Sequence, residues 1–187
     1  LETVQRWDGS GLSDALKTEI RRLYVQYQLL EDQIAEIAQA YQQELLNDTA
    51  VAHTRRQLEQ LKSIGPKTSR VLSAEVFSWR VFNNGKQVGG MAGLTPTPSR
   101  SGDVIKEQGI SKAGNRRVRR VMIELAWFWL KWQPGSHLSQ WFNRRFARGG
   151  KRMRRVGIVA LARKLLIALW RYVEFGVLPE GAVLKAV

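Results

Sequence analysis

The sequence predicts a mainly α-helical protein, in which a long N-terminal coiled-coil helix precedes a compact helical domain with a small β-hairpin near Ser101. Apolar residues in the first third of the chain recur in steps of three and four, as in a coiled coil. In the last third they recur at the spacing of amphipathic helices, and Gly, Asn and Pro gather before it, at residues 77–100. We therefore expect a coiled-coil spacer or dimerisation arm at residues 1–50 and a second domain at residues 51–187.

Residues 14–45 are predicted to form one long helix, with Ser13 as its N-cap. Its apolar seam consists of Leu16, Ile20, Leu23, Tyr27, Leu30, Ile34, Ile37 and Tyr41. A seam of this kind is typical of a coiled coil, formed with a second chain or by folding back on the same chain. An ordinary amphipathic helix packed on the core is the alternative.

A helix–turn–helix element is predicted next, with its tight turn at Ser63-Ile64-Gly65. Pro66 fits the first position of the following helix, where its missing N–H costs nothing. The pattern resembles the helix-hairpin-helix, in which backbone N–H groups at the turn hold a DNA phosphate, although Ser63 replaces the usual first glycine. A plain packing element is the alternative. The residues that would contact the phosphate are Gly65, Lys67 and Thr68.

Residues 95–100 and 104–108 are predicted to pair as two short strands, with Ser101-Gly102 at the turn between them. Ser111 is the expected N-cap of a helix over residues 112–132. The apolar face of that helix is formed by Val118, Val121, Met122, Leu125, Trp129 and Trp132. Trp127 falls on the opposite, arginine-bearing side, where it could stack on a base or lie in a subunit interface.

Two further helices are predicted after the breaks at Pro134-Gly135 and Gly149-Gly150, over residues 138–148 and 152–175. The inward side of the first carries Leu138, Trp141, Phe142 and Phe146. The second buries Val159, Ala162, Leu166, Leu169 and Val173.

The charge of the chain is strongly positive and unevenly distributed. The formal net charge is +14. Residues 1–60 hold six Lys and Arg against ten Asp and Glu, whereas residues 100–155 hold fifteen against three. Such a concentrated block predicts a phosphate-facing surface and a nucleic-acid partner, with a merely solvated face as the alternative. The cations that we expect at DNA are Lys112, Arg116, Arg117, Arg119, Arg120, Arg144, Arg145, Arg152, Arg154 and Arg155.

Several functional classes are excluded or disfavoured. The chain has no cysteine, so disulfides and thiolate metal sites are excluded. Its two histidines, His53 and His137, have no ligand partner at helical spacing, and we expect neither a metal nor a cofactor site in this chain. No apolar run is long enough to cross a membrane, and no signal peptide is visible. The first residue is Leu, so we expect a piece of a longer protein.

Several blocks, taken in order, resemble the C-terminal, catalytic-serine domain of the DEDD-type insertion-sequence transposases, which are related to Piv-type DNA invertases. The similarity covers about residues 55–175. It is carried by the segment from Leu58 to Thr68, by Ala92-Gly93-Leu94-Thr95-Pro96, by Ser101-Gly102, and by Ser111-Lys112-Ala113-Gly114-Asn115 with Arg119-Arg120.

The resemblance implies that residues 51–187 are a transposase domain and that Ser101 attacks the DNA backbone, forming a covalent phosphoserine link during strand exchange. It also implies a RuvC-like N-terminal domain with four acidic ligands for Mg²⁺, which this chain lacks. The implied partners are the insertion-sequence ends and target DNA, and in some members a structured guide RNA. We expect a homo-oligomer formed through the 14–45 helix, located in the prokaryotic cytoplasm at the nucleoid.

On its own the chain is expected to bind DNA without recombining it. A non-catalytic helix-hairpin-helix module that binds DNA or RNA and dimerises is the competing function, in which Ser101 only caps a turn or contacts a phosphate. If Ser101 is catalytic, chain order suggests Arg116, Arg119 or Arg120 as the arginine nearest the scissile phosphate.

Overall fold

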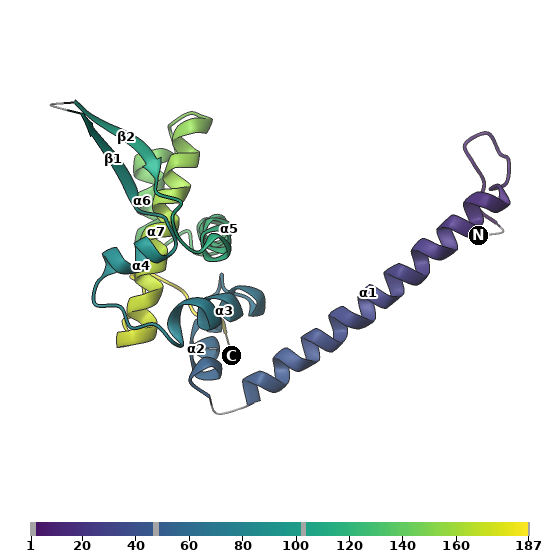
Figure 1. Cartoon of the computed structure of the whole chain (residues 1–187), viewed down its shortest axis with the longest axis horizontal. Coiled ribbons are helices and arrows are strands. Elements are labelled where there is room, and N and C mark those ends of the chain that lie inside the picture. Colours follow the sequence, from purple (N-terminus) through teal and green to yellow (C-terminus); the bar gives the residue numbers. More distant parts are fainter. Residues whose placement is uncertain (1–2, 47–48, 102–103, 187) are drawn as a thin grey trace. The chain divides into compact units, whose positions relative to one another are not determined.

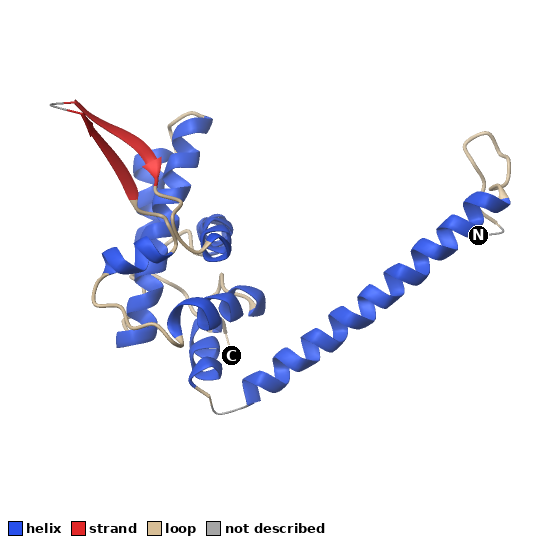
Figure 2. Ribbon diagram, in the orientation of Figure 1, coloured by secondary structure: helices blue, strands red, loops and turns tan. Residues whose placement is uncertain are grey.

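The computed structural model describes residues 3–46, 49–101 and 104–186, and at residues 45, 98–101 and 104–108 it describes the backbone alone. The described residues are mainly helical, with a small two-stranded antiparallel sheet, as the sequence predicts (Figure 2). The chain divides into two compact units, Leu1–Asn47 and Asp48–Val187. Within the described ranges, no helix is both long and apolar enough to cross a membrane.

The first unit consists mainly of α1 (Asp14–Leu46), which confirms the predicted long helix. The hydroxyl of Ser13 accepts a 3.4 Å hydrogen bond from the backbone N–H of Leu16, as expected of an N-cap. Most of the apolar seam faces solvent within this unit; the exposed fraction of Ile34, for example, is 66%. An exposed seam agrees with a helix whose partner is another molecule or segment, but the coiled coil itself stays a prediction.

The second unit is built around α7 (Lys151–Phe175), which contacts α2, α4, α5 and α6. Figure 1 shows α7 running through this unit, with the hairpin projecting from it. The other elements are α2 (Ala50–Glu59), α3 (Pro66–Leu72), the π-helix η1 (Ser73–Phe77), α4 (Gly85–Met91), β1 (Pro96–Ser101), β2 (Val104–Ile110), α5 (Arg116–Trp132) and α6 (His137–Phe146).

The core forms where the apolar faces of α5, α6 and α7 meet. Leu161, Leu165 and Leu169 of α7 are fully buried, as are Met122 and Trp129 of α5. These residues recur every three or four positions, so each helix directs one apolar stripe inward. Burying each such side chain stabilises the fold by about 1.5–3 kcal/mol.

The close approach of α6 to α7 depends on Gly157. A Cβ atom at this position would lie 2.5 Å from a ring atom of Phe146 and 2.9 Å from one of Phe142. Because Gly157 has no side chain, both rings can pack directly against the backbone of α7. The inward positions of Phe142 and Phe146 agree with the prediction.

The C-terminal end of α5 differs from the prediction at Trp132, which was expected on the apolar face. Its exposed fraction is 45%, and Lys131 Nζ lies 5.2 Å from its ring centroid. The helix ends at this residue, so the ring lies beyond the last packed turn. The core instead uses Trp129, whose indole N–H donates a 2.8 Å hydrogen bond to the buried hydroxyl of Ser136.

Candidate nucleic-acid interface

The base of the hairpin is formed by two sequence blocks that lie directly against each other. Ser111 N donates to Thr95 O at 2.8 Å, and Lys112 N donates to Gly93 O at 3.1 Å. Asn115 N donates to Met91 O at 2.8 Å. The segment that leads into β1 is therefore bonded to the segment that leaves β2, and both meet the start of α5.

This close contact explains why both blocks contain a glycine. A Cβ on Gly114 would lie 2.4 Å from Met91 O and 2.6 Å from Gly93 N, both backbone atoms that cannot move aside. Gly93 has φ +64° and Lys112 has φ +55°, so the chain turns through left-handed conformations on both sides of the contact. The Gly-Leu-Thr-Pro and Ser-Lys-x-Gly blocks therefore have a structural role as the joint between the hairpin and the helices.

Helix α5 begins at Arg116, four residues later than predicted, and its N-cap is Asn115 rather than Ser111. Asn115 Oδ1 accepts hydrogen bonds from Arg117 N at 2.9 Å and from Val118 N at 3.1 Å. The predicted start is excluded because the left-handed Lys112 cannot continue a right-handed helix.

The arginines at the start of α5 have different environments. Arg117 Nη1 lies 2.8 Å from Glu75 Oε1, and Arg120 Nε lies 3.0 Å from Glu124 Oε1. Arg119 Nη1 donates to Ala92 O at 3.1 Å and to Lys112 O at 3.0 Å. Arg116 is exposed and has no hydrogen-bond or ion-pair partner among the described residues. Three of the arginines that the sequence analysis assigned to DNA phosphates, Arg117, Arg119 and Arg120, therefore bind other groups of the protein.

Arg119 ties together the two sides of the hairpin base, because Ala92 precedes β1 and Lys112 follows β2. Its guanidinium occupies the space that a side chain at Gly93 would fill: a Cβ there would lie 2.7 Å from Arg119 Nη1. In this position Arg119 supports the hairpin instead of facing outward with Arg116 and Arg120.

Ser101 ends β1, and its backbone pairs with Val104 at the start of β2. Its side chain, and the predicted turn residues Gly102 and Asp103, lie outside the described residues. At the other end of the hairpin Pro96 pairs with Ile110. With a rise of about 3.3 Å per residue, Ser101 stands about 17 Å beyond Pro96 along β1.

The hairpin therefore separates Ser101 from the arginines of α5. Figure 1 shows the strands projecting away from the helices, whereas α5 begins at the hairpin base. Which arginine lies nearest the scissile phosphate, expected from chain order to be Arg116, Arg119 or Arg120, stays a prediction.

A second group of cations lies where α6 ends and α7 begins, and we call it the α6–α7 corner. Its members are Arg144, Arg145, Arg148, Lys151, Arg152, Arg154 and Arg155, all exposed. None of them has an acidic partner among the described residues. Arg144 and Arg145 lie in the last turn of α6, where the helix dipole favours cations, whereas Lys151, Arg152 and Arg154 lie in the first turn of α7, where it opposes them. A surface of unpaired cations of this density is suited to an extended polyanion.

The predicted helix–turn–helix consists of α2, the turn before Gly65, and α3. Ile64 is buried beneath the turn, Lys67 is exposed, and Gly65 and Thr68 are half-buried. Gly65 has an ordinary φ of −102°, and no atom lies within 4 Å of the position of a Cβ there. Packing among the described residues therefore does not require glycine at this position. The helix-hairpin-helix assignment stays a prediction.

The C-terminal segment supports this turn, which the sequence did not indicate. Lys185 Nζ donates to Ile64 O at 2.8 Å, and Lys185 N donates to Gln60 O at 2.7 Å. The buried amide of Gln133 bonds both the N–H and the C=O of Val183, at 2.7 and 2.8 Å. The last residues thus connect the end of α5 to the predicted phosphate-binding turn.

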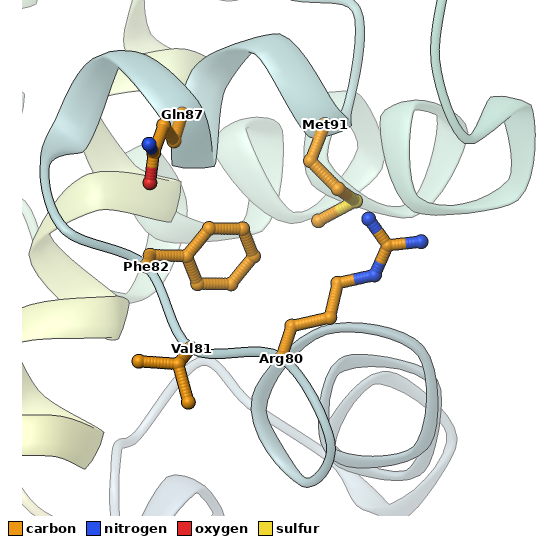
Figure 3. A pocket seen from close by; sticks show the side chains of 5 residues that line it. All are labelled: Arg80, Val81, Phe82, Gln87 and Met91. Atoms are coloured by element: carbon orange, nitrogen blue, oxygen red, sulfur yellow. The ribbon is translucent and has the colours of Figure 1, made fainter.

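An open cavity of about 460 Å³ lies between α4 and the loop that precedes it (Figure 3), lined by Arg80, Val81, Phe82, Gln87 and Met91. The Arg80 guanidinium lies 4.1 Å from the ring centroid of Trp79. Phe82 and Met91 also pack against the core. The sequence analysis did not anticipate the cavity, because no periodicity links the loop before α4 to the helix itself.

The sequence of this chain is similar to the sequences of several transposases. The family model described as Transposase IS116/IS110/IS902 family matches residues 55–141. "Putative transposase y4rJ" of Sinorhizobium fredii is 42% identical over 195 residues, which is 99% of this chain and 49% of that protein. "Transposase for insertion sequence element IS1328" of Yersinia enterocolitica is 29% identical over 154 residues, covering 81% of this chain and 44% of that protein. The chain therefore spans about half the length of the curated relatives it matches.

Proposed function

We propose that the chain is the DNA-binding, serine-bearing part of an insertion-sequence transposase, because residues 55–141 match the IS116/IS110/IS902-family transposase model. The proposal rests on the match to this domain together with one structural observation. The Gly93–Gly114 contact gives the strand that carries Ser101 and the helix that carries Arg116 a common, rigid base.

In the proposed reaction the Ser101 hydroxyl attacks a phosphorus atom of the DNA backbone. The Oγ–P bond forms as the P–O bond to one deoxyribose breaks; the serine gives up its proton and the released sugar oxygen takes one up. Because one phosphodiester replaces another, bond energy is conserved and no ATP is needed. The Mg²⁺ ions implied by the family resemblance would bind in the other half of the longer protein and stabilise the charged oxygens.

The proposed DNA surface combines the α6–α7 corner, Arg116 and the turn at Gly65. The corner is the largest group of exposed cations without acidic partners in the described residues, and such cations bind DNA by releasing condensed counterions. The half-buried Gly65 and the exposed Lys67 add a site where a phosphate can approach backbone N–H groups.

We further propose that α1 joins two copies of the chain through its apolar seam. The exposed fractions of Leu23, Leu30 and Ile34 are 54, 56 and 66%. A helix with such a seam gains stability by burying it against a second helix. A second copy could also bring cations to Ser101, which stands away from the arginines of its own α5.

The separation of Ser101 from α5 also supports a second candidate function. In this alternative the chain binds DNA or RNA and dimerises but catalyses no reaction. Arg117 and Arg119 already have protein partners. If no other group neutralises a phosphate at Ser101, the serine hydroxyl is too weak a nucleophile to react.

Covalent trapping on the full-length protein distinguishes the two functions. The protein is incubated with nicked element-end DNA and Mg²⁺, and adducts are located by mass spectrometry. Ser101→Ala removes the proposed nucleophile, and Ser99→Ala is the matched control because it lies two residues earlier on the same strand. We expect an adduct on Ser101 that persists in Ser99→Ala and disappears in Ser101→Ala. No adduct in the unmodified protein, with DNA binding intact, contradicts the catalytic role and favours the binding module.

A further inference from the structure

The solvent-facing side of α5 carries a continuous stripe of cationic and apolar residues. The buried side of the helix contains Val118, Met122, Leu125 and Trp129. On the other side, at steps of three and four, lie the exposed Arg116, Arg120, Trp127 and Lys131, together with Ile123, which is half-buried and packs against the edge of the core. We call these five residues the α5 stripe; at 1.5 Å per residue it is about 22 Å long.

A shallow cavity begins at the N-terminal end of the α5 stripe. Its volume is about 290 Å³, and it is lined by Arg116, Arg119, Arg120, Ile123 and Glu124. Glu124 is already paired with Arg120 at 3.0 Å. Arg116 contributes an unpaired charge, so the cavity offers a net positive wall beside the apolar side chain of Ile123.

Trp127 lies one turn beyond this cavity, with an exposed fraction of 43%. Its position is not explained by the core, because Trp129 fills the interior on the opposite side of the helix with its indole N–H bonded to Ser136. An exposed indole between cations presents a flat aromatic face next to positive charge. Single-stranded nucleic acid is recognised by this combination: bases stack on the aromatic ring and the backbone follows the cations.

We propose that the α5 stripe binds an unpaired segment of nucleic acid, with a base stacked on Trp127 and backbone phosphates at Arg116, Arg120 and Lys131. The inference rests on the proposed function, since it names the form of the nucleic acid that this domain receives. An unpaired segment fits better than a duplex because a duplex hides its base faces in the stack, where Trp127 cannot reach them. The cationic flanks favour a polyanion over an apolar protein surface.

The test uses this chain and fluorescently labelled oligonucleotides of equal length: single-stranded DNA, single-stranded RNA and duplex DNA. Binding is measured by anisotropy for the unmodified chain and for Trp127→Ala, Trp127→Phe and Phe128→Ala. Phe128→Ala is the matched control because Phe128 lies on the same helix, has a similar exposed fraction (52%) and is outside the stripe, whereas the ring of Trp132 contacts Lys131 of the stripe. Circular dichroism verifies that each variant is folded.

We expect Trp127→Ala to weaken binding of single strands by between about 5-fold and about 150-fold, the range for loss of one stacked base. Binding of duplex DNA should change by less than about 2-fold, and Trp127→Phe should retain most of the affinity because it retains a stacking ring. Phe128→Ala should match the unmodified chain. The DNA and RNA arms show which polymer is preferred.

Three outcomes overturn the inference. Trp127→Ala could leave single-strand binding unchanged, could weaken single-strand and duplex binding equally, or could change the oligomeric state of the chain, which would assign Trp127 to a protein interface. In each case duplex binding by the unmodified chain leaves the proposed function standing. If the unmodified chain binds none of the oligonucleotides, the proposed function fails together with the inference.

Discussion

The side-chain amide of Asn115 donates a 2.6 Å hydrogen bond to Glu75 Oε2, joining the start of α5 to the π-helix η1. The other carboxylate oxygen of Glu75 pairs with Arg117 at 2.8 Å. Asn115 at the same time caps α5 through its amide oxygen. One amide and one carboxylate therefore hold together the first turn of α5, one of its arginines and a segment 40 residues earlier in the chain.

Replacing Asn115 should reveal both of these roles. Asn115→Ala loses the cap and the bond to Glu75, and we expect the free energy of unfolding to fall by about 1–3 kcal/mol. Asn115→Ser can still cap the helix but cannot reach Glu75 as an amide does, so its loss should be intermediate. Denaturant unfolding followed by circular dichroism measures both variants. Asn143→Ala, an exposed position inside α6, serves as the control and should lie within about 0.5 kcal/mol of the unmodified chain.

Gly114→Ala tests the joint at the hairpin base. The added Cβ would meet Met91 O at 2.4 Å and Gly93 N at 2.6 Å, so the two blocks must separate. We expect a loss of at least about 1–3 kcal/mol in the free energy of unfolding. Gly135→Ala is the control, because nothing lies within 4 Å of a Cβ there and its φ is not positive. Equal stability of the Gly114 variant and the unmodified chain would contradict the close contact.

Local sequence patterns predicted most of the helical fold. The seam of α1, the apolar stripes of α5 and α7, and the breaks at Pro134-Gly135 and Gly149-Gly150 each depend on residues a few positions apart. The hairpin was also predictable, because turn-forming residues separate two short segments that can pair. The start of α5 was misplaced because Ser111 and Asn115 are both good N-caps, and the left-handed Lys112 that excludes Ser111 lies in a segment bonded to residues 91–95, far from it in sequence.

The site was less predictable because its chemistry depends on distant contacts. Sequence alone treats Arg116, Arg117, Arg119 and Arg120 as equivalent cations. In the structure Glu75 pairs with Arg117, two backbone carbonyls bind Arg119, and Arg116 remains unpaired among the described residues. No periodicity links Glu75 to Arg117, so three-dimensional information is needed to separate structural arginines from those available for DNA.

Arg116 and Arg119 should consequently respond in opposite ways to substitution by Gln. Arg119→Gln removes the guanidinium that bonds Ala92 O and Lys112 O, and we expect the free energy of unfolding to fall by about 1.5–3 kcal/mol. Arg116→Gln should leave stability within about 0.5 kcal/mol, weaken duplex DNA binding and reduce the slope of log K against log salt by about 1. Denaturant unfolding and salt-dependent anisotropy give the two readouts. Identical behaviour of the two variants in both measurements would show that this distinction is wrong.

The α6–α7 corner should contribute to binding at a cost to stability. In the double variant Arg152→Gln, Arg154→Gln, we expect the salt slope of duplex binding to fall by about 1.8, or about 0.9 for each lost phosphate contact. Stability should rise by a few tenths of a kcal/mol per substitution, because both cations lie in the first turn of α7 and oppose its dipole.

Arg22→Gln controls for the loss of a positive charge as such, since Arg22 lies on α1 and pairs with Glu19. An equal decrease in salt slope per charge in this variant would mean that overall charge, not the corner, determines binding.

The seam of α1 gives the sharpest test of assembly, because single residues on opposite sides of one exposed helix can be compared. Ile34→Lys places a charge in the seam at a residue that is 66% exposed in the isolated helix and would be buried in a coiled coil. We expect the molar mass measured by light scattering to fall from that of an oligomer to that of a single chain. Gln39→Lys adds the same charge on the opposite side of α1 and should leave the mass unchanged. Because α1 and the proposed DNA surface belong to different compact units, we expect Ile34→Lys to preserve the intrinsic affinity of each chain for DNA while reducing the avidity of the assembly. A single-chain mass for the unmodified protein would contradict the proposal that α1 joins two copies of the chain.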